Sequence, residues 1–414
     1  MVRELERSSA SEKRNLSDFP ETAPAANPVF FRTYSRRTET GRETWAEVCD
    51  RTVKGLQKLG NLTPEETQLL HRMQNELKTL ASGRWLWVGG SKWIEQPENF
   101  SGAYNCSSTN ILDWRSFGLL MDLAMMGCGT GAVLEPQYIN QLPPIRNRLT
   151  LTMQGEIGST PAQSRRQETE VKIAEKTATI YVGDSRQGWV SSYQSLLELS
   201  TDERFAGEVQ VFIDLSDVRP VGEPLKGFGG VANPVKLPDL YQRCAAILNK
   251  ALGRQLNSVE CCVLIDEAAV TIVAGNIRRS AGIRQFDSSD ELGANAKNNL
   301  WQQDENGNWK IDPDRDALRM ANHSRVFHHK PTREECIDAV RQQYYSGEGA
   351  IQWAGEAVAR ANVDLLSTPS LKLEFLKAYD EGKAKQWFQE RYPDMTAEEL
   401  EHRSVRLGLN PCGK

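Results

Sequence analysis

The spacing of apolar residues along the chain predicts a mixture of helices and strands. Residues 237–252 carry apolar side chains at helical spacing. Residues 258–273 are almost all apolar, which predicts a helix that is capped by Ser258 and buried on most sides. Residues 208–215 alternate between apolar and polar side chains, which predicts a core strand.

Four Thr and Glu pairs, each three residues apart, have the sequence of a capping box at a helix start. They are Thr44 with Glu47, Thr63 with Glu66, Thr332 with Glu335, and Thr396 with Glu399. Pro64 at the first helical position strengthens the second of them. The first two boxes predict a helical lead-in over residues 28–100. Residues 1–27 have no apolar period and are expected to form a mobile leader.

Other segments have less regular patterns. The chain near 114–126 is apolar and predicts a helix, and the aromatic run 82–90, closed by glycines, predicts a strand. Residues 149–206 are polar and charged, with a helix-like stretch near 168–177, and are interpreted as an inserted subdomain. Residues 287–316 are acidic and rich in Asn, which predicts a surface excursion.

Composition limits the kinds of protein this can be. The chain has 414 residues, of which 39% are hydrophobic, enough for two or three domains or for one large α/β barrel. Its formal charge of -5 argues against a protein that grips nucleic acid, whereas a small anionic ligand stays possible. A membrane span and a secretory signal are both unexpected, so the cytoplasm is the default location.

Cysteine and histidine spacing gives no sign of a metal site. The eight cysteines show no CxxC spacing, and the five histidines form no HExxH motif. Cys261 and Cys262 are adjacent on a predicted helix and therefore point apart, as core residues rather than as a redox pair. In a reducing compartment any disulfide would be catalytic.

Two cysteines have local sequences that allow a chemical role. Cys412 stands between Asn410-Pro411 and Gly413, a turn that would present its thiol to a partner. Cys106 lies among small hydroxyl and amide side chains. On local sequence alone, an ordinary loop cysteine is favoured for Cys412, and a half-buried cysteine at a strand end is favoured for Cys106.

Two arginine-bearing loops are candidates for binding anions. Arg278 and Arg279 follow Gly275 directly after the buried helix, and Arg219 follows the strand 208–215 ahead of a glycine cluster. Arginine presents a planar fork of donors that suits phosphates. A solvated charge pair and a plain connection are the alternatives.

The run Gly127-Cys128-Gly129-Thr130-Gly131 also has the sequence of a glycine loop in S-adenosylmethionine-dependent methyltransferases. In that fold the glycines follow a strand and open a helix. Here the order looks reversed, because the preceding segment has a helical period and prolines follow too soon for a long helix. A methyltransferase is therefore the remote alternative.

Taken together, several short motifs in this order resemble adenosylcobalamin-dependent (class II) ribonucleotide reductase, of the monomeric ribonucleoside-triphosphate reductase type. The motifs lie at residues 33–36, 82–84, 105–106, 185–190, 214–220 with 227–230, 273–281 and 410–413. The resemblance covers nearly the whole chain. It implies the amino-terminal half of a ten-stranded α/β barrel, which would occupy residues 101–414.

The resemblance also implies a reaction and residues that carry it. The family reduces ribonucleoside triphosphates to deoxyribonucleotides, with adenosylcobalamin as cofactor and thioredoxin or a similar dithiol as reductant. Cys412 would carry the thiyl radical, Asn410 would bind the ribose hydroxyls, and Cys106 would be one half of the reducing dithiol. The residues that match segments lining the nucleotide pocket are Ser82, Asn105, Ser107, Gly129, Gly131, Asn410, Pro411 and Gly413.

Regulation is implied as well. The loop with Asn276, Arg278 and Arg279 matches the family's specificity loop, and Arg219 is placed where a deoxynucleotide effector's phosphate would bind. Residues 149–206 fall where monomeric members carry an insertion at the effector site, so a monomer is expected.

One departure from the family motif stands at the last residue, where Lys414 replaces a glutamate that serves as acid and base. The second cysteine of the dithiol and most of the cobalamin surface are also missing. The chain is therefore interpreted as an amino-terminal portion that needs its carboxy-terminal part. An inert fragment, or one interrupted by an intein, is the alternative.

Overall fold

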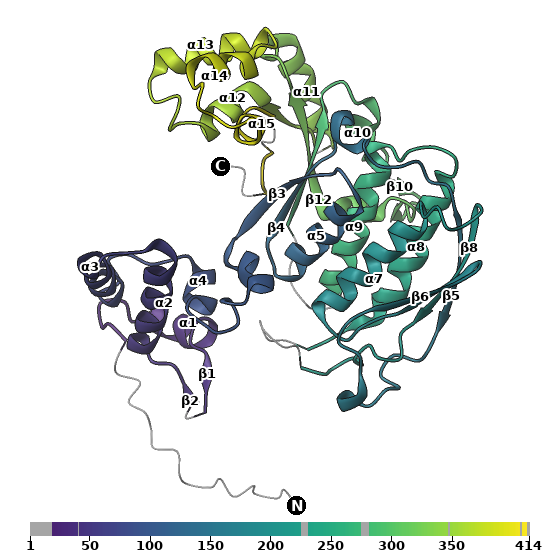
Figure 1. The fold of residues 1–414 in the computed structure, drawn as a ribbon, viewed down its shortest axis with the longest axis horizontal. Coiled ribbons are helices and arrows are strands. Elements are labelled where there is room, and N and C mark those ends of the chain that lie inside the picture. The colour runs from purple at the N-terminus through teal and green to yellow at the C-terminus, as the bar shows by residue number, and fades with distance from the viewer. Residues whose placement is uncertain are drawn as a thin grey trace, which may run out of the picture. The chain divides into compact units, whose positions relative to one another are not determined.

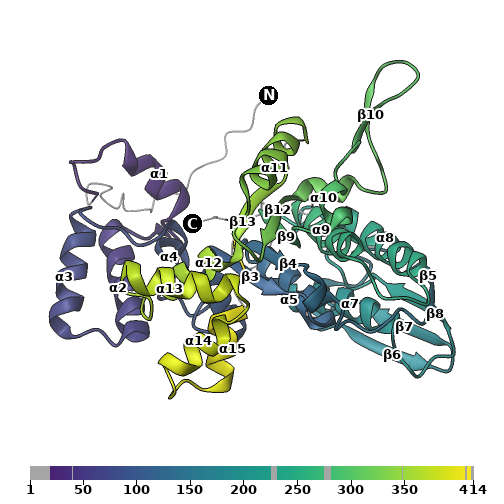
Figure 2. The same ribbon diagram turned by 90° about the horizontal axis from the view of Figure 1, so that it is seen from above.

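The computed structural model describes residues 19–39, 41–224, 231–274, 281–346, 348–405 and 408–411. The chain divides into two compact units, Met1–Asn105 and Cys106–Lys414, which are described separately (Figure 1 and Figure 2). None of the helices in these described ranges is long and apolar enough to cross a membrane.

The first unit is mainly helical. Its core joins Phe19, Phe30 and Trp45 in aromatic contact, so the packed part includes a residue of the expected leader. Both predicted capping boxes are confirmed, at Thr44 and at Thr63. Its elements are α1 (Ala26–Thr33), β1 (Arg37–Thr38), β2 (Gly41–Arg42), α2 (Trp45–Gly60), α3 (Pro64–Asn75), α4 (Gly83–Val88) and a 3₁₀ helix (Pro97–Ala103).

The strand predicted over residues 82–90 is wrong, because this segment forms helix α4. The Ser82 side chain accepts a hydrogen bond from the Trp85 backbone N–H and caps the helix. The Trp85 indole is buried and donates to the Thr52 carbonyl on α2, 3.1 Å away. Tertiary packing has therefore overridden the preference of aromatic residues for strands.

The second unit contains a parallel sheet of five strands in the order β13-β12-β9-β4-β3. These strands are β3 (Cys106–Asn110), β4 (Gly129–Val133), β9 (Gly282–Asp287), β12 (Ala321–Phe327) and β13 (Ala350–Trp353). The α/β class is as expected, whereas the described strands form an open sheet and no closed barrel.

Two helices pack on one face of this sheet, and two more separate them from a second sheet (Figure 1 and Figure 2). The first pair is α5 (Trp114–Met125) and α9 (Ser258–Ala274), and the second is α7 (Arg186–Leu199) and α8 (Leu237–Lys250). The glycine run 127–131 thus follows a helix and enters a strand, as predicted. One hydrophobic core spans all of these layers.

The second sheet has the strand order β5-β8-β7-β6. Its strands are β5 (Arg148–Gln154), β6 (Glu170–Ala174), β7 (Thr177–Tyr181) and β8 (Glu208–Asp214). The helix predicted near 168–177 is wrong, because β6 and β7 form an antiparallel hairpin. The chain reverses at Glu175, whose φ of 49° is left-handed. The charged residues around it gave no indication of this turn in the sequence.

Helix α9 is buried on most sides, as predicted, but its cap is not Ser258. The Asn257 side chain accepts from the Glu260 N–H at 2.8 Å, and the Glu260 carboxylate accepts from the Asn257 N–H at 2.9 Å. Asn257 and Glu260 thus form a reciprocal cap, in which the amide oxygen accepts from the first turn and the carboxylate reaches back. Ser258 instead donates to Asp290.

A buried ion pair joins α9 to the five-stranded sheet. Arg284 on β9 binds Asp266 on α9 at 2.7 Å, and both side chains are fully inaccessible to solvent. Arg284 also donates to the Thr130 carbonyl of β4, 2.9 Å away. The guanidinium therefore links one helix to two strands.

The remaining elements of the second unit are smaller. Helices α12 (Ala354–Ala361), α13 (Pro369–Asp380), α14 (Ala384–Arg391) and α15 (Ala397–Val405) form a carboxy-terminal lobe around Phe375 and Phe388. The predicted surface excursion carries an exposed hairpin with Trp301 and Trp309. The hairpin consists of β10 (Trp301–Gln303) and β11 (Trp309–Ile311). The other helices of this unit are α6 (Pro136–Ile139), α10 (Glu291–Asn295) and α11 (Arg333–Ser346).

Replacing Arg284 with methionine should lower the free energy of unfolding by about 3–5 kcal/mol, because the Asp266 charge would stay buried without its partner. The control is Arg254→Met, which breaks the more exposed pair with Glu260 and should cost at most about 1 kcal/mol. Urea denaturation of both variants measures the difference. Equal losses would contradict a special role for the buried pair.

Candidate functional site

The five-stranded sheet has one face that points away from α5 and α9. Because side chains alternate along a strand, the strand register decides which residues share this face. Cys106 pairs with Gly129, Ser108 pairs with Gly131, and Val133 pairs with Gln285. This open face therefore carries the Cys106 sulfur, which is bonded in a disulfide, together with a hydroxyl and an amide beside two glycines.

Residues 408–411 return to the open face after the carboxy-terminal lobe. The Gln285 amide donates to the Leu409 carbonyl at 2.9 Å, and the Leu409 N–H donates to the Gln285 side-chain oxygen at 2.7 Å. The Gln285 side chain thus binds the main chain in both directions, as a neighbouring strand would. It is only 1% exposed, so these bonds are shielded from water.

The two glycines of β4 leave the space that this segment occupies. A Cβ atom at Gly131 would lie 2.3 Å from the Leu409 carbonyl oxygen. A Cβ atom at Gly129 would lie 2.9 Å from the Cys106 sulfur and 3.1 Å from the Pro411 ring. No larger residue fits at either position without moving its neighbours. The glycines therefore bring Cys106 close to Pro411.

The structure brings together most of the predicted site residues that it describes in this unit. Cys106, Gly129, Gly131, Asn410 and Pro411 meet on the open face. The next residue of β3, Ser107, donates its hydroxyl to the Gly129 carbonyl at 3.3 Å.

Two of the other predicted residues belong to the first unit, and five are not described. Ser82 caps α4, and the Asn105 side chain accepts from Arg84 at 3.3 Å, both within the first unit. Cys412, Gly413, Asn276, Arg278 and Arg279 lie outside the described residues.

Arg219, the predicted effector contact, has partners within the protein. Its guanidinium donates to the Asp184 carboxylate at 2.7 Å and to the Pro224 carbonyl at 3.0 Å. Arg165 approaches the other Asp184 oxygen and binds Glu223 in a two-pronged pair. An anion at Arg219 would therefore have to compete with Asp184.

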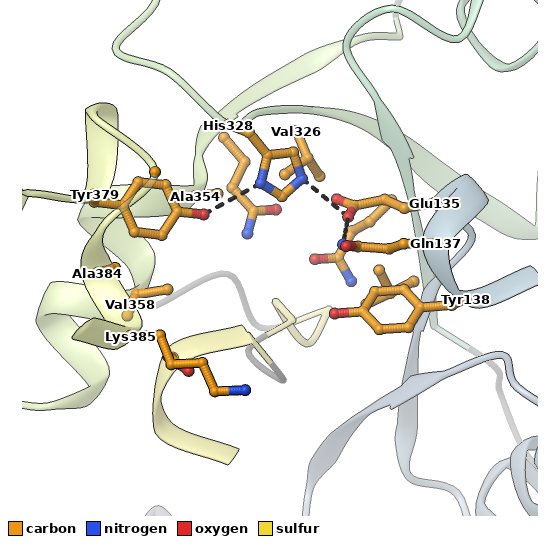
Figure 3. Close-up of a pocket in the computed structure, with 15 residues that line it drawn as sticks. Glu135, Gln137, Tyr138, Val326, His328, Ala354, Val358, Tyr379, Ala384 and Lys385 are labelled. Carbon is orange, nitrogen blue, oxygen red and sulfur yellow. Dashed lines mark hydrogen bonds and ion pairs between the residues drawn. The ribbon is translucent and has the colours of Figure 1, made fainter. Parts of the chain in front are cut away.

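Sequence reasoning missed a cavity beside the open face, shown in Figure 3. It has a volume of about 270 Å³ and lies where β4, β9, β12 and β13 end, next to the carboxy-terminal lobe. His328 stands between two partners there, at 2.9 Å from the Glu135 carboxylate and 3.2 Å from the Tyr379 hydroxyl. Glu135 is 3% exposed.

Electrostatics at this cavity favour a charged histidine. The hydrogen bond to Glu135 raises the pKa of His328 above its usual value, although partial burial opposes this shift. The bond from His328 to Glu135 therefore strengthens on protonation, while the other ring nitrogen contacts Tyr379 on α13.

Comparisons with known proteins agree on one family. Residues 155–248 match the family model "B12-dependent ribonucleotide reductase, insertion domain". The sequence is 28% identical over 321 residues to "Probable adenosylcobalamin-dependent ribonucleoside-triphosphate reductase" of Dictyostelium discoideum, covering 72% of this chain and 39% of the relative. It is 27% identical over 310 residues to "Adenosylcobalamin-dependent ribonucleoside-triphosphate reductase" of Levilactobacillus brevis, covering 64% of this chain and 41% of the relative. The chain is thus similar in sequence to B12-dependent ribonucleotide reductases.

A solved structure gives the same result for the fold. The crystal structure of a B-12 dependent (class II) ribonucleotide reductase superimposes with a TM-score of 0.57 at 20% identity, over 72% of this chain and 45% of that one. This chain spans about two fifths of the length of the curated reductases named above, 39% and 41%. The insertion-domain match begins at residue 155 and includes β8 and most of α8.

Removing the amide of Gln285 should loosen residues 408–411. In Gln285→Ala the Leu409 N–H loses its acceptor, so its exchange with solvent deuterium should accelerate roughly tenfold or more. Mass spectrometry of the terminal peptide measures this. Gln255→Ala is a matched control, because the Gln255 amide also binds two main-chain carbonyls, those of Asn140 and Leu142. Unchanged exchange in Gln285→Ala would show that the two bonds between Gln285 and Leu409 do not hold residues 408–411.

His328 should make stability depend on pH. Since its pKa is raised in the folded state, its contribution is fully present below the unfolded value of about 6.5 and is lost as pH rises through the folded value. Thermal unfolding of wild type and His328→Gln should therefore differ most in mildly acidic buffer. In Tyr379→Phe an NMR titration should still find a raised pKa for His328, because Glu135 is the main cause of the shift. A normal pKa for His328 would refute this assignment.

Proposed function

We propose that this chain forms the part of an adenosylcobalamin-dependent ribonucleoside-triphosphate reductase that holds the substrate ribose and one reducing thiol. One observation carries the proposal: Cys106 and the Asn410-Pro411 turn meet on one face of the parallel sheet, held by Gln285 and two glycines. The names of the curated relatives supply the substrate class and the cofactor.

In this proposal the residues of the chain have separate roles. Cys412, the residue after Pro411, carries the thiyl radical and removes the ribose 3′ hydrogen. The Asn410 amide, which has both a donor and an acceptor, binds the ribose hydroxyls. Cys106 and a second thiol supply two electrons as the 2′ hydroxyl leaves as water. A closed barrel around them would keep water and other thiols from the radical.

The described residues fit only part of the cofactor. Adenosylcobalamin supplies the radical that starts the family's reaction. The cavity next to the terminal segment, about 270 Å³, falls at the lower end of small-molecule sites and is too small for a corrin ring. This chain would therefore hold at most a portion of the cofactor. The remainder of the ten-stranded barrel would provide the rest, in a monomeric cytoplasmic enzyme.

Allosteric control belongs to the same proposal. The insertion-domain match supports an effector site near Arg219, with Asn276, Arg278 and Arg279 in the loop that relays the effector's identity. A deoxynucleotide phosphate would have to take Arg219 from Asp184. Thioredoxin or another dithiol would reduce the enzyme after each turnover.

A second candidate is an inert or intein-interrupted fragment of such a reductase. It is favoured by Lys414, which replaces the family's glutamate. Reading the coding DNA beyond codon 414 separates the two, because a downstream piece with the missing motifs supports the enzyme. The methyltransferase alternative lacks support, since the glycine run enters a strand rather than opening a helix.

Turnover assays test the proposed function. With a ribonucleoside triphosphate, adenosylcobalamin and a dithiol, the chain alone should give no deoxynucleotide, because it spans about 39% and 41% of the named reductases. Co-expression with the polypeptide that carries the remaining length should give product, and Cys106→Ser should abolish it. Cys336→Ser, at a partly exposed thiol on α11, should not. Product that survives Cys106→Ser would refute the role of Cys106.

A further inference from the structure

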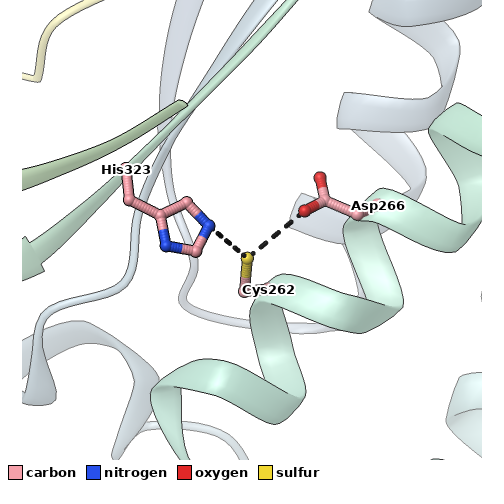
Figure 4. A group of neighbouring side chains, drawn as sticks. All are labelled: Cys262, Asp266 and His323. Atoms are coloured by element: carbon pink, nitrogen blue, oxygen red, sulfur yellow. Dashed lines mark hydrogen bonds between the residues drawn. The ribbon is translucent and has the colours of Figure 1, made fainter. Parts of the chain in front are cut away.

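Three potential metal-binding side chains meet in the core behind the open face, as Figure 4 shows. Cys262 and Asp266 are four residues apart on α9, a spacing that places both on one side of a helix. His323 reaches them from β12. The Cys262 sulfur lies 3.4 Å from an Asp266 oxygen and 3.7 Å from the His323 Nε2 atom.

These separations are close to those between ligands of one tetrahedral ion. Zinc binds sulfur at about 2.3 Å and nitrogen or oxygen at about 2.0–2.2 Å, which puts two of its ligands about 3.3–3.7 Å apart. All three ligand atoms lie within 4.8 Å of one another, and all three residues are buried. The cluster therefore needs little rearrangement to take an ion.

Asp266 is already oriented for such a role. Its Oδ1 atom accepts two hydrogen bonds from Arg284, at 3.1 and 2.7 Å, while its Oδ2 atom faces Cys262. A partner that fixes a ligating carboxylate in this way is usual around metal ions. The nearby cations are also compensated, because Arg284 pairs with Asp266 and Lys297 pairs with Glu348.

We propose that Cys262, Asp266 and His323 form a binding site for a zinc-type transition-metal ion that joins α9 to β12. A thiol and an imidazole favour zinc over magnesium or calcium, which prefer oxygen ligands. On binding, Cys262 releases its proton to the buffer and ligates as a thiolate. A water molecule would fill the fourth position. The site lies in the core between α9 and β12 and is separate from the proposed radical chemistry.

The neighbouring cysteine provides a matched control. Cys261 is equally buried and also a free thiol, but it is the next residue along the helix and points elsewhere. Cys262→Ser and Cys261→Ser therefore remove the same atom type from the same depth. Only the first should affect metal binding.

The experiment uses the full chain, without an affinity tag and fully reduced, loaded with zinc chloride and then dialysed. Wild type and Cys261→Ser should retain about one zinc per chain, and Cys262→Ser should bind zinc at least about tenfold more weakly. Zinc should raise the unfolding temperature of the first two proteins only. Cobalt substituted for zinc should give a thiolate-to-cobalt absorption band in wild type.

Several outcomes would overturn the proposal. One is that the wild-type chain retains no zinc, and another is a cobalt spectrum without a thiolate band. A third is equal zinc retention by Cys262→Ser, which would indicate adventitious binding at surface residues such as His329 and Glu335. The cobalt spectrum of the unmodified chain decides the question even if Cys262→Ser fails to fold. Circular dichroism of the metal-free variant checks its folding.

Discussion

The ion pair between Arg284 and Asp266 is the contact on which the rest of the second unit depends. It lies between the five-stranded sheet and α9 with no access to solvent, so its attraction is weakly screened and its loss would leave a bare charge in the core. The same guanidinium holds the Thr130 carbonyl, which stands between Gly129 and Gly131. The position of the glycine strand is thus set from behind, by a residue that never faces the open side.

Strand β9 joins the two sides of the sheet through adjacent residues. Arg284 points toward the helices, whereas Gln285 points to the open face and binds Leu409. The alternation of side chains along a strand makes this division possible. A shift of β9 would therefore strain its bonds to α9 and to the terminal segment at the same time. These bonds resist such a shift and give the proposed substrate face a rigid support.

Local sequence predicted those features that local chemistry decides. The capping boxes at Thr44 and Thr63 and the order of helix, glycines and strand at 127–133 were found as expected. The prediction failed at α4 because distant packing decided there, since its tryptophan packs against α2. It failed at the hairpin that begins with Glu170 because the turn at Glu175 was not recognised.

The site shows the same limit. Short motifs identified Cys106, the β4 glycines and the Asn410-Pro411 turn, because each lies within a contiguous run. Glu135 and His328 are 193 residues apart, and Gln285 lies 124 residues before Leu409. No pattern within one segment reveals such pairs. The fold alone brings them together.

The carboxy-terminal lobe begins directly after β13 and ends just before the segment that returns to the sheet. It is therefore a loop whose two ends are anchored on one rigid platform. The entropy of closing such a loop grows only slowly with its length, so insertions into the lobe cost little. Related proteins could differ widely in size here while their chain re-enters the sheet at the same point.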